Sequence, residues 1–171
     1  MKKLFFIFLV NIFLSNIVFA QDFSKEIVQN FDNPKALGSY SLRVWGFHIY
    51  EISTIAQDLK NYRDKFAICI KYNRNFSKEE LVEASIDEIL RIKEIDENKA
   101  KIYRKYLNKI FTDVKIGDRK TAIIDKNGLQ LYHNSVLIDS VKDADFALDF
   151  ADIWLHEKAK YKKMRNELLK L

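Results

Sequence analysis

The sequence predicts an α+β fold in which a large antiparallel sheet packs against helices. Two observations support this class. Short stretches of alternating apolar residues lie close together in both halves of the chain, and longer stretches with helical spacing separate and follow them. Strands that occur in groups, instead of alternating one by one with helices, favour an antiparallel sheet with its helices on one face.

The first strands surround the run LRVWGFHIY. Alternation predicts strands over 39–44 and 47–55, or one long bent strand. Gly46 should lie at the bend, because an interior glycine marks a bulge or a close approach by another group. The preceding stretch, 30–37, is expected to be a short lead-in. The run FAICIKY at 66–72 predicts the next strand, which both faces of the sheet can cover.

Two helices should follow these strands. Ser77 with Glu80 forms the capping-box pattern, which predicts a helix that runs to about Lys93. A second helix is expected over 97–111, where aromatic and aliphatic residues recur at the helical period. Such a stripe is more often part of a core than the wall of a ligand site.

A hairpin and two further helices complete the predicted order. Gly117 and Asp118 form a turn, and Asn127 with Gly128 is the strongest short signal for a hairpin. The other expected elements are strands at 121–124, 129–133 and 136–140, a helix capped by Asp143, and a final helix that holds Met164, Leu168 and Leu169.

The N-terminal segment has the pattern of a secretory signal peptide. Two lysines precede an apolar run at 4–14, and the small residue Ala20 follows. The expected organisation is a signal peptide over 1–20, cleaved after Ala20, and one domain over 21–171. The product would be periplasmic or secreted, without a stable membrane span. An uncleaved anchor is the alternative, but polar residues interrupt a segment shorter than the roughly 20 residues that a span needs.

Composition and spacing argue against several classes of partner. The formal net charge of +5 falls to +3 without residues 1–20, which is only mildly basic, and the densest basic stretch, 158–165, is interpreted as a solvated helix face. No nucleic-acid partner is therefore expected. Cys69 is the only cysteine, which excludes an intramolecular disulfide and favours a buried, inert thiol. The histidines lie far apart without ligand spacing, so no metal or other cofactor is expected.

Several motifs occur in a fixed order along the chain. They are ALGSYSLRVWGFHIY at 36–50, FAICIKYNRNFSKEELVEASIDEI at 66–89, GDRKTAII, LYHNSVLIDSV and FALDFADIWL. The most specific parts are the WGF run that ends at Tyr50, the Gly117-Asp118 turn, the pair His133 and Asn134, and the triplet Ile153-Trp154-Leu155 with Arg165 and Leu168-Leu169 downstream. In this order they closely resemble the bacterial exported branch of the chalcone isomerase-like family. The resemblance implies an open-faced β-sandwich with a ligand cleft between sheet and helices.

This resemblance implies two different activities. Plant members of the family isomerise chalcones to flavanones, and related plastid members bind fatty acids. In the plant enzyme an arginine steadies the attacking phenolate, and a threonine and a tyrosine organise water at the substrate carbonyl. Laid on this chain, the threonine position falls on Trp45, the tyrosine position on Phe76 and a substrate-contacting asparagine position on Glu83. Because these hydroxyls are missing, no catalytic residue is assigned.

The favoured function is non-catalytic binding of a small apolar or fatty-acid-like ligand in the cleft. Arg43 with Tyr50 or Tyr72 is expected to fix an acidic head group, because an arginine fork suits a carboxylate. One alternative is a periplasmic isomerase, an intramolecular lyase of the chalcone isomerase type. Another is a structural or partner-binding protein with a filled cleft, in which Arg43 only pairs with a surface acid. The candidate ligand-binding residues are Arg43, Trp45, Phe47, Tyr50, Tyr72 and Phe76.

Overall fold

The structure is a computed structural model that describes residues 23–171. The predicted signal peptide and its cleavage after Ala20 lie outside these residues. The described chain forms a six-stranded antiparallel sheet in which the strands follow the order of the sequence. The strands are β1 (Lys35–Val44), β2 (Phe47–Ala56), β3 (Lys65–Tyr72), β4 (Arg119–Asp125), β5 (Gly128–His133) and β6 (Val136–Val141).

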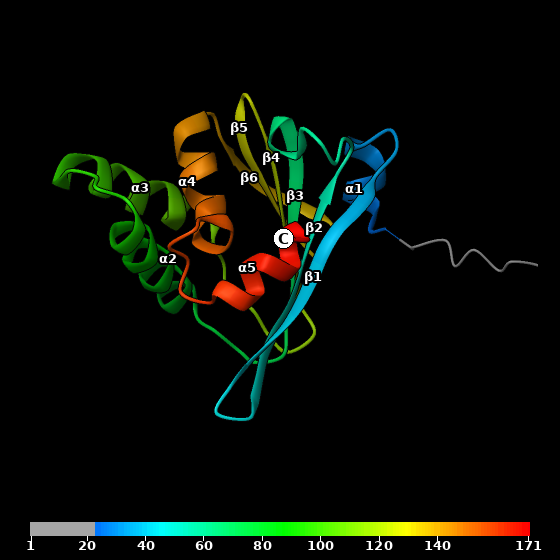
Figure 1. Cartoon of the computed structure of the whole chain (residues 1–171). Helices are drawn as coiled ribbons and strands as arrows, with labels where there is room; N and C mark the ends of the chain where they lie inside the picture. The colour runs from blue at the N-terminus through cyan, green and yellow to red at the C-terminus, as the bar shows by residue number, and fades with distance from the viewer. Residues whose placement is uncertain (1–22) are drawn as a thin grey trace, which may run out of the picture.

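The helices are distributed unequally over the two faces of the sheet (Figure 1). Four of them cover one face, and the short α1 lies on the other. This arrangement confirms the predicted α+β class and the layer of helices. Among residues 23–171, no helix combines the length and the apolar character that crossing a membrane requires. The helices are α1 (Lys25–Asn30), the 3₁₀ helix η1 (Tyr62–Asp64), α2 (Lys78–Ile92), α3 (Glu97–Ile110), α4 (Ala144–Leu155) and α5 (Lys162–Leu169).

The β1–β2 hairpin turns at Trp45 and Gly46. Val44 pairs with Phe47 across this two-residue turn, and the turn residues have left-handed φ angles of 48° and 84°. Positive φ at both central residues is typical of a type I′ turn, whose twist matches that of the flanking strands. The prediction of a bend at Gly46 is confirmed, and two separate strands are found there instead of one bent strand.

The N-terminal part of the domain differs from the prediction in two ways. The stretch 30–37 is not an irregular lead-in throughout, since β1 already begins at Lys35, which pairs with Ala56 of β2. Helix α1 was not predicted, because six residues are too few to show a helical period. Its Ile27, together with Phe31, packs on apolar residues of the outer face of the sheet.

Cys69 faces this outer side of the sheet, where it is half-buried. Burial raises the pKa of its thiol to about 12, so the thiol stays protonated at neutral pH. Beside it, the Thr121 hydroxyl donates a hydrogen bond of 2.6 Å to Glu26 Oε1 of α1. This contact ties the short helix to β4.

Helices α2 and α4 begin at the predicted capping residues. The Ser77 hydroxyl accepts a hydrogen bond from the Glu80 backbone N–H at 3.2 Å, and the Glu80 carboxylate accepts one from the Ser77 N–H at 2.7 Å. At α4, the Asp143 carboxylate accepts from the Phe146 N–H at 2.9 Å. Both caps satisfy backbone donors that have no partner inside the helix.

The β4–β5 turn lies one residue earlier than predicted. Asp125 pairs with Gly128, so the turn residues are Lys126 and Asn127, and Gly128 is the first residue of β5. Gly128 has a φ of 130°, and a Cβ atom there would lie 2.0 Å from the carbonyl oxygen of Val141. Gly128 is therefore favoured both by its positive φ and by the close approach of β6, although it is not one of the two turn residues.

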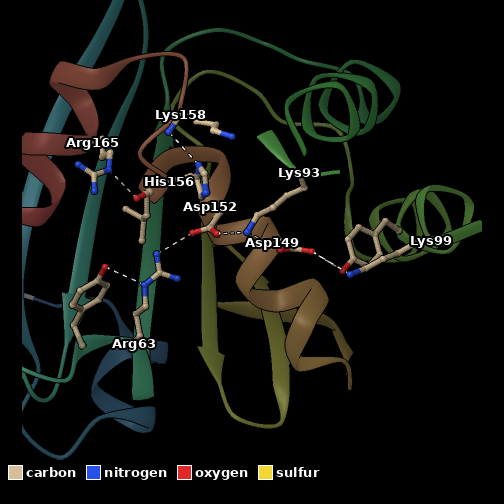
Figure 2. Close-up of polar contacts among 11 residues, drawn as sticks. Arg63, Lys93, Lys99, Asp149, Asp152, His156, Lys158 and Arg165 are labelled. Carbon is tan, nitrogen blue, oxygen red and sulfur yellow. Dashed lines mark hydrogen bonds and ion pairs between the residues drawn. The ribbon is translucent and has the colours of Figure 1, made fainter. Parts of the chain in front are cut away.

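An ionic network holds α4 against its neighbours (Figure 2). Asp152, which is 4% exposed, accepts hydrogen bonds or ion pairs from Arg63 at 2.9 Å and from Lys93 at 2.7 Å. Asp149 lies 3.1 Å from the same Lys93 ammonium and accepts a hydrogen bond from the Tyr103 hydroxyl at 2.8 Å. The network fixes α4 to η1, to the end of α2 and to α3, and so fixes one wall of the site described next.

Candidate functional site

A cleft of about 880 Å³ lies between the helix-facing side of the sheet and helices α2, α4 and α5. Strands β1 to β5 supply one wall, and the helices with the segment that joins α4 to α5 supply the other. Most of its lining is aliphatic or aromatic, which is typical of a site for an apolar ligand. The apolar lining includes Leu42, Ile49, Ile68, Ile70, Leu81, Phe111, Leu131, Phe150, Ile153 and Met164.

Aromatic side chains from β2, β3 and the start of α2 meet in this cleft. Tyr50 pairs with Tyr72 across the two strands, and their rings meet edge to face with centroids 6.4 Å apart. The ring of Phe76 meets Tyr72 in the same way at 5.9 Å. On the helix side, the Trp154 indole N–H donates a hydrogen bond of 3.2 Å to the Tyr50 hydroxyl.

Both tyrosine hydroxyls remain protonated. Burial raises the pKa of Tyr50 and of Tyr72, because a phenolate in an apolar cleft would lose its hydration. The Tyr50 hydroxyl is engaged, since it accepts from Trp154 and points toward the Met164 sulfur at 3.9 Å. The Tyr72 hydroxyl has no hydrogen-bond partner among residues 23–171 and is therefore available to a ligand.

Lys120 supplies a cation to the same cleft. It lies on β4 with Ala122 and Ile124 on the helix-facing side, whereas Thr121 faces α1. The side chain is only 3% exposed, and its ammonium donates a hydrogen bond of 2.6 Å to Thr112 Oγ1. No carboxylate of the described chain lies within 4.0 Å of this ammonium.

The surroundings of Lys120 disfavour the charged form of its side chain. Burial lowers the pKa of the ammonium to about 8, and the more distant charges of Asp118 and Asp113 only partly oppose this effect. The ammonium is still mostly protonated at neutral pH. The cleft thus holds a buried positive charge that has one neutral hydrogen-bond acceptor and no counter-ion from residues 23–171.

A series of polar side-chain contacts extends from Lys120 through Thr112 and His133 to Asp118. Thr112 Oγ1 lies 3.1 Å from His133 Nδ1, and His133 Nε2 lies 3.1 Å from Asp118 Oδ2 without the alignment of a hydrogen bond. A tautomer with the proton on Nε2 lets the Thr112 hydroxyl donate to Nδ1 while it accepts from Lys120. Thr112 is then held with a lone pair toward the ammonium. Asp118 is itself fixed by Asn134 at 2.9 Å.

The structure divides the six residues that the sequence predicted for ligand binding. Tyr50, Tyr72 and Phe76 lie together in the cleft. The other three lie at the β1–β2 turn outside the cleft, where Trp45 is 95% exposed and Phe47 is 60% exposed. The three residues outside the cleft are Arg43, Trp45 and Phe47.

The position of the turn explains this separation. Trp45 is a central turn residue, so its side chain cannot follow the alternation of a strand. The register of the pairing shifts between Leu42, which is buried, and Arg43, which is exposed. Arg43 takes part in none of the ion pairs formed within residues 23–171, with Glu51 or with any other acid. Trp45 and Phe47 are not core residues either.

Of the three positions at which the family resemblance placed catalytic or substrate-contacting groups, one lies in the cleft and two lie outside it. Phe76 lines the cleft and carries no hydroxyl. Trp45 lies outside the cleft, and Glu83 is exposed on α2, where it pairs with Arg104. Sequence reasoning missed Lys120, although the strand KTAII places it on the same face as Ala122 and Ile124. Within residues 23–171, no group of His, Cys, Asp or Glu side chains gathers in a way that could hold a metal ion.

A sheet packed on helices, with a mostly apolar cleft between the two layers, defines the class of this α+β domain. A family model described as chalcone isomerase-like matches residues 42–170, and the chain belongs to this family. The structure is also similar to the crystal structure of a fatty-acid binding protein from Arabidopsis thaliana. The TM-score is 0.60 at 13% sequence identity, over 81% of this chain and 87% of that chain, which shows a shared fold. A comparison with curated protein sequences finds no match.

Proposed function

We propose that the protein binds a fatty-acid-like ligand, with the apolar chain in the cleft and the carboxylate at Lys120. The observation that carries this proposal is the position of Lys120, a residue only 3% exposed, on the wall of a mostly apolar cleft of about 880 Å³. An unpaired charge in such a place is costly, and an acidic ligand would supply the missing counter-charge. The similar structure from A. thaliana is that of a fatty-acid binding protein, which supports the same class of ligand.

Tyr72 is the second anchor in this proposal. Ile70 of β3 pairs with Lys120 of β4, and Tyr72 is the next residue on the same face of β3. Tyr72 and Lys120 are therefore diagonal neighbours across the two strands, with Cα atoms about 7–8 Å apart. A carboxylate between them would accept hydrogen bonds from the ammonium and from the free tyrosine hydroxyl. Tyr72, one of the predicted anchors, keeps its role, and Lys120 takes the role predicted for Arg43.

The location outside the cytoplasm belongs to the same proposal. It is supported by the two N-terminal lysines, the apolar run at 4–14 and the small residue Ala20. N-terminal sequencing of the protein recovered from its own cell envelope tests it. A chain that starts at Gln21 is the expected result, and a chain that keeps its first residues would contradict cleavage.

The ligand proposal is tested by native mass spectrometry of the purified protein, followed by calorimetric titration with decanoate, decanol and methyl decanoate. We expect co-purified acids in the mass spectrum and tighter binding of decanoate than of the two uncharged analogues. Equal binding of all three compounds would contradict an anchored head group. Conversion of a hydroxychalcone to the flavanone by the same preparation would support the isomerase alternative instead.

A pair of variants isolates the anchor. Lys120→Met keeps the length of the side chain and removes its charge, and Lys126→Met removes an exposed charge from the β4–β5 turn. Lys120→Met should weaken decanoate binding by at least about tenfold, since a hydrogen bond to a charged group contributes roughly 1.5–3 kcal/mol. Its affinity for decanol should stay unchanged. Lys126→Met should bind both compounds like the wild type.

A further inference from the structure

Five of the ten exposed large apolar residues among residues 23–171 lie at one end of the sheet, from the β1–β2 turn at one edge to the start of β6 at the other. Figure 1 shows this hairpin projecting beyond the rest of the sheet. We call residues 44–47 the hairpin tip. The neighbouring connections reach the same end, since Asn75 accepts a hydrogen bond from the Ile116 N–H at 2.9 Å. The exposed large apolar residues here are Trp45, Phe47, Ile116, Val136 and Leu137.

The Trp45 side chain contributes no packing that would stabilise the fold. Its φ of 48° is a left-handed conformation that Asn or Gly adopts readily and a bulky side chain adopts rarely. The other two-residue turn of this kind, between β5 and β6, uses Asn134 and Ser135. The indole of Trp45 is 95% exposed, so packing does not offset the strained backbone. Unfavourable backbone conformations that no packing contact compensates occur preferentially at functional positions.

Basic side chains surround the hairpin tip. The guanidinium of Arg74 lies over the ring of Phe47, 5.3 Å from its centroid. Two carboxylates lie near the same end and keep their negative charge: Asp113 accepts a hydrogen bond from a backbone N–H at the start of α2, and Asp118 accepts one from Asn134. The exposed basic residues outnumber them. The exposed basic residues at this end are Arg43, Arg74, Lys115 and Arg119.

We propose that the hairpin tip docks on the surface of an anionic lipid bilayer. Trp rings settle at the level of the lipid head groups, Phe rings insert at the boundary with the acyl chains, and basic side chains are attracted to anionic lipids. A projecting two-residue turn is too small for a protein interface, which needs about 800 Å² from each partner, whereas a bilayer admits single side chains. Leu42 and Ile49, on either side of the tip, line the cleft, so docking brings the cleft next to the membrane. The docking itself does not depend on a ligand in the cleft.

The test is sedimentation with vesicles of phosphatidylcholine alone or mixed with phosphatidylglycerol. The wild type should sediment with the anionic vesicles and much less with the neutral ones, and added salt should reduce binding. Trp45→Asn should reduce binding at least fivefold while the melting temperature is kept or raised, because Asn suits the left-handed turn. Arg43→Ser with Arg74→Ser should remove the preference for anionic lipid. Leu59→Asn, at an exposed apolar residue of the β2–β3 connection, is the matched control and should bind like the wild type.

Tryptophan emission gives a second readout. The chain has two tryptophans, so the difference between the wild type and Trp45→Asn reports on Trp45. Anionic vesicles should shift this difference spectrum to shorter wavelength. All variants share the same N-terminus, so residues 1–22 alone cannot produce a difference between them. The proposal is overturned if Trp45→Asn binds vesicles like the wild type, if the emission of Trp45 does not move, or if Trp45→Asn only dissolves a self-associated form in the absence of lipid.

Discussion

At the scale of single residues, Lys120 connects the stability of the protein with the proposed binding of a ligand. It occupies a helix-facing position of β4 that Ala122 and Ile124 continue as an apolar face. Burial lowers the pKa of its ammonium to about 8, and Thr112 provides the one hydrogen bond that offsets part of the lost hydration. Near neutral pH the protein therefore carries the cost of a buried charge, which is the condition under which an anionic ligand gains most.

This cost predicts that Lys120→Met stabilises the protein in a pH-dependent way. The unfolded chain keeps the proton up to its ordinary pKa of 10.5, whereas the folded chain releases it near pH 8. Between these values the unfolded state binds more protons, so the stability of the wild type relative to the variant rises with pH. Near pH 7 the variant should be more stable by on the order of 2 kcal/mol, after the loss of the Thr112 hydrogen bond is counted.

Urea denaturation of both proteins near pH 7, 9 and 10.5 measures this effect. The difference in free energy of unfolding should be largest near pH 7 and shrink across the two higher values. The buried tyrosines are common to both proteins and cancel in the difference. A variant less stable than the wild type near pH 7, or a difference that does not change with pH, would show that the buried charge carries no such cost.

At the scale of elements, the sequence predicts where a helix begins when the groups that stabilise its first turn lie within a few residues of that position. The caps at Ser77 and Asp143 satisfy donors of the helices that they begin, so the sequence alone locates both starts. The start of β1 depends on the pairing of Lys35 with Ala56, and this distant partner leaves no local pattern. Helix α1 depends in the same way on contacts of Ile27 with the outer face of the sheet.

The ionic network of α4 leads to a prediction at this scale. Asp152→Asn removes the charge that Arg63 and Lys93 share, and Lys93 is left with Asp149. Removal of one member of a buried ionic contact is strongly destabilising, but the basic partners here are partly exposed. We therefore expect a loss of about 2 kcal/mol. Urea denaturation should show a lower midpoint with an unchanged slope.

The matched control for Asp152→Asn is Glu97→Gln. Glu97 pairs with Lys101 on the exposed side of α3, one turn along the helix, at 2.8 Å. An exposed pair of this kind contributes only about 0.3–0.5 kcal/mol. If the two substitutions lower the midpoint equally, the network does not anchor α4 and the wall of the cleft is held by apolar packing alone.

At the scale of the whole molecule, the sequence predicted a cleft between sheet and helices, and three of the six residues predicted to bind a ligand line it. Tyr50, Tyr72 and Phe76 were predictable because strand alternation and the helix cap direct them to the same side. Arg43 was misplaced because its direction depends on a register shift beside the turn. The side-chain contacts from Lys120 through Thr112 to His133 join β4, the segment after α3 and the end of β5. These three segments are distant in the sequence, and only the folded sheet brings them together.

The final prediction concerns the intact protein with its ligand, and it rests on the proposed fatty-acid-like function. A bound carboxylate replaces the missing counter-charge, so decanoate should raise the melting temperature near pH 7. At 100 times the dissociation constant this stabilisation amounts to about 2.7 kcal/mol. Above about pH 8 the free protein loses the Lys120 proton, and each further pH unit should weaken decanoate binding by up to about tenfold.

Decanol provides the internal control, because it has no charge to pair with Lys120. Its effect on the melting temperature should be nearly the same on both sides of pH 8, while the effect of decanoate declines. Lys120→Met should make the two compounds behave alike at every pH, since the titrating group is gone. A decanoate-induced shift that is as large near pH 9.5 as near pH 7 would mean that the carboxylate is held elsewhere, and Tyr72→Phe would then be the next variant to compare.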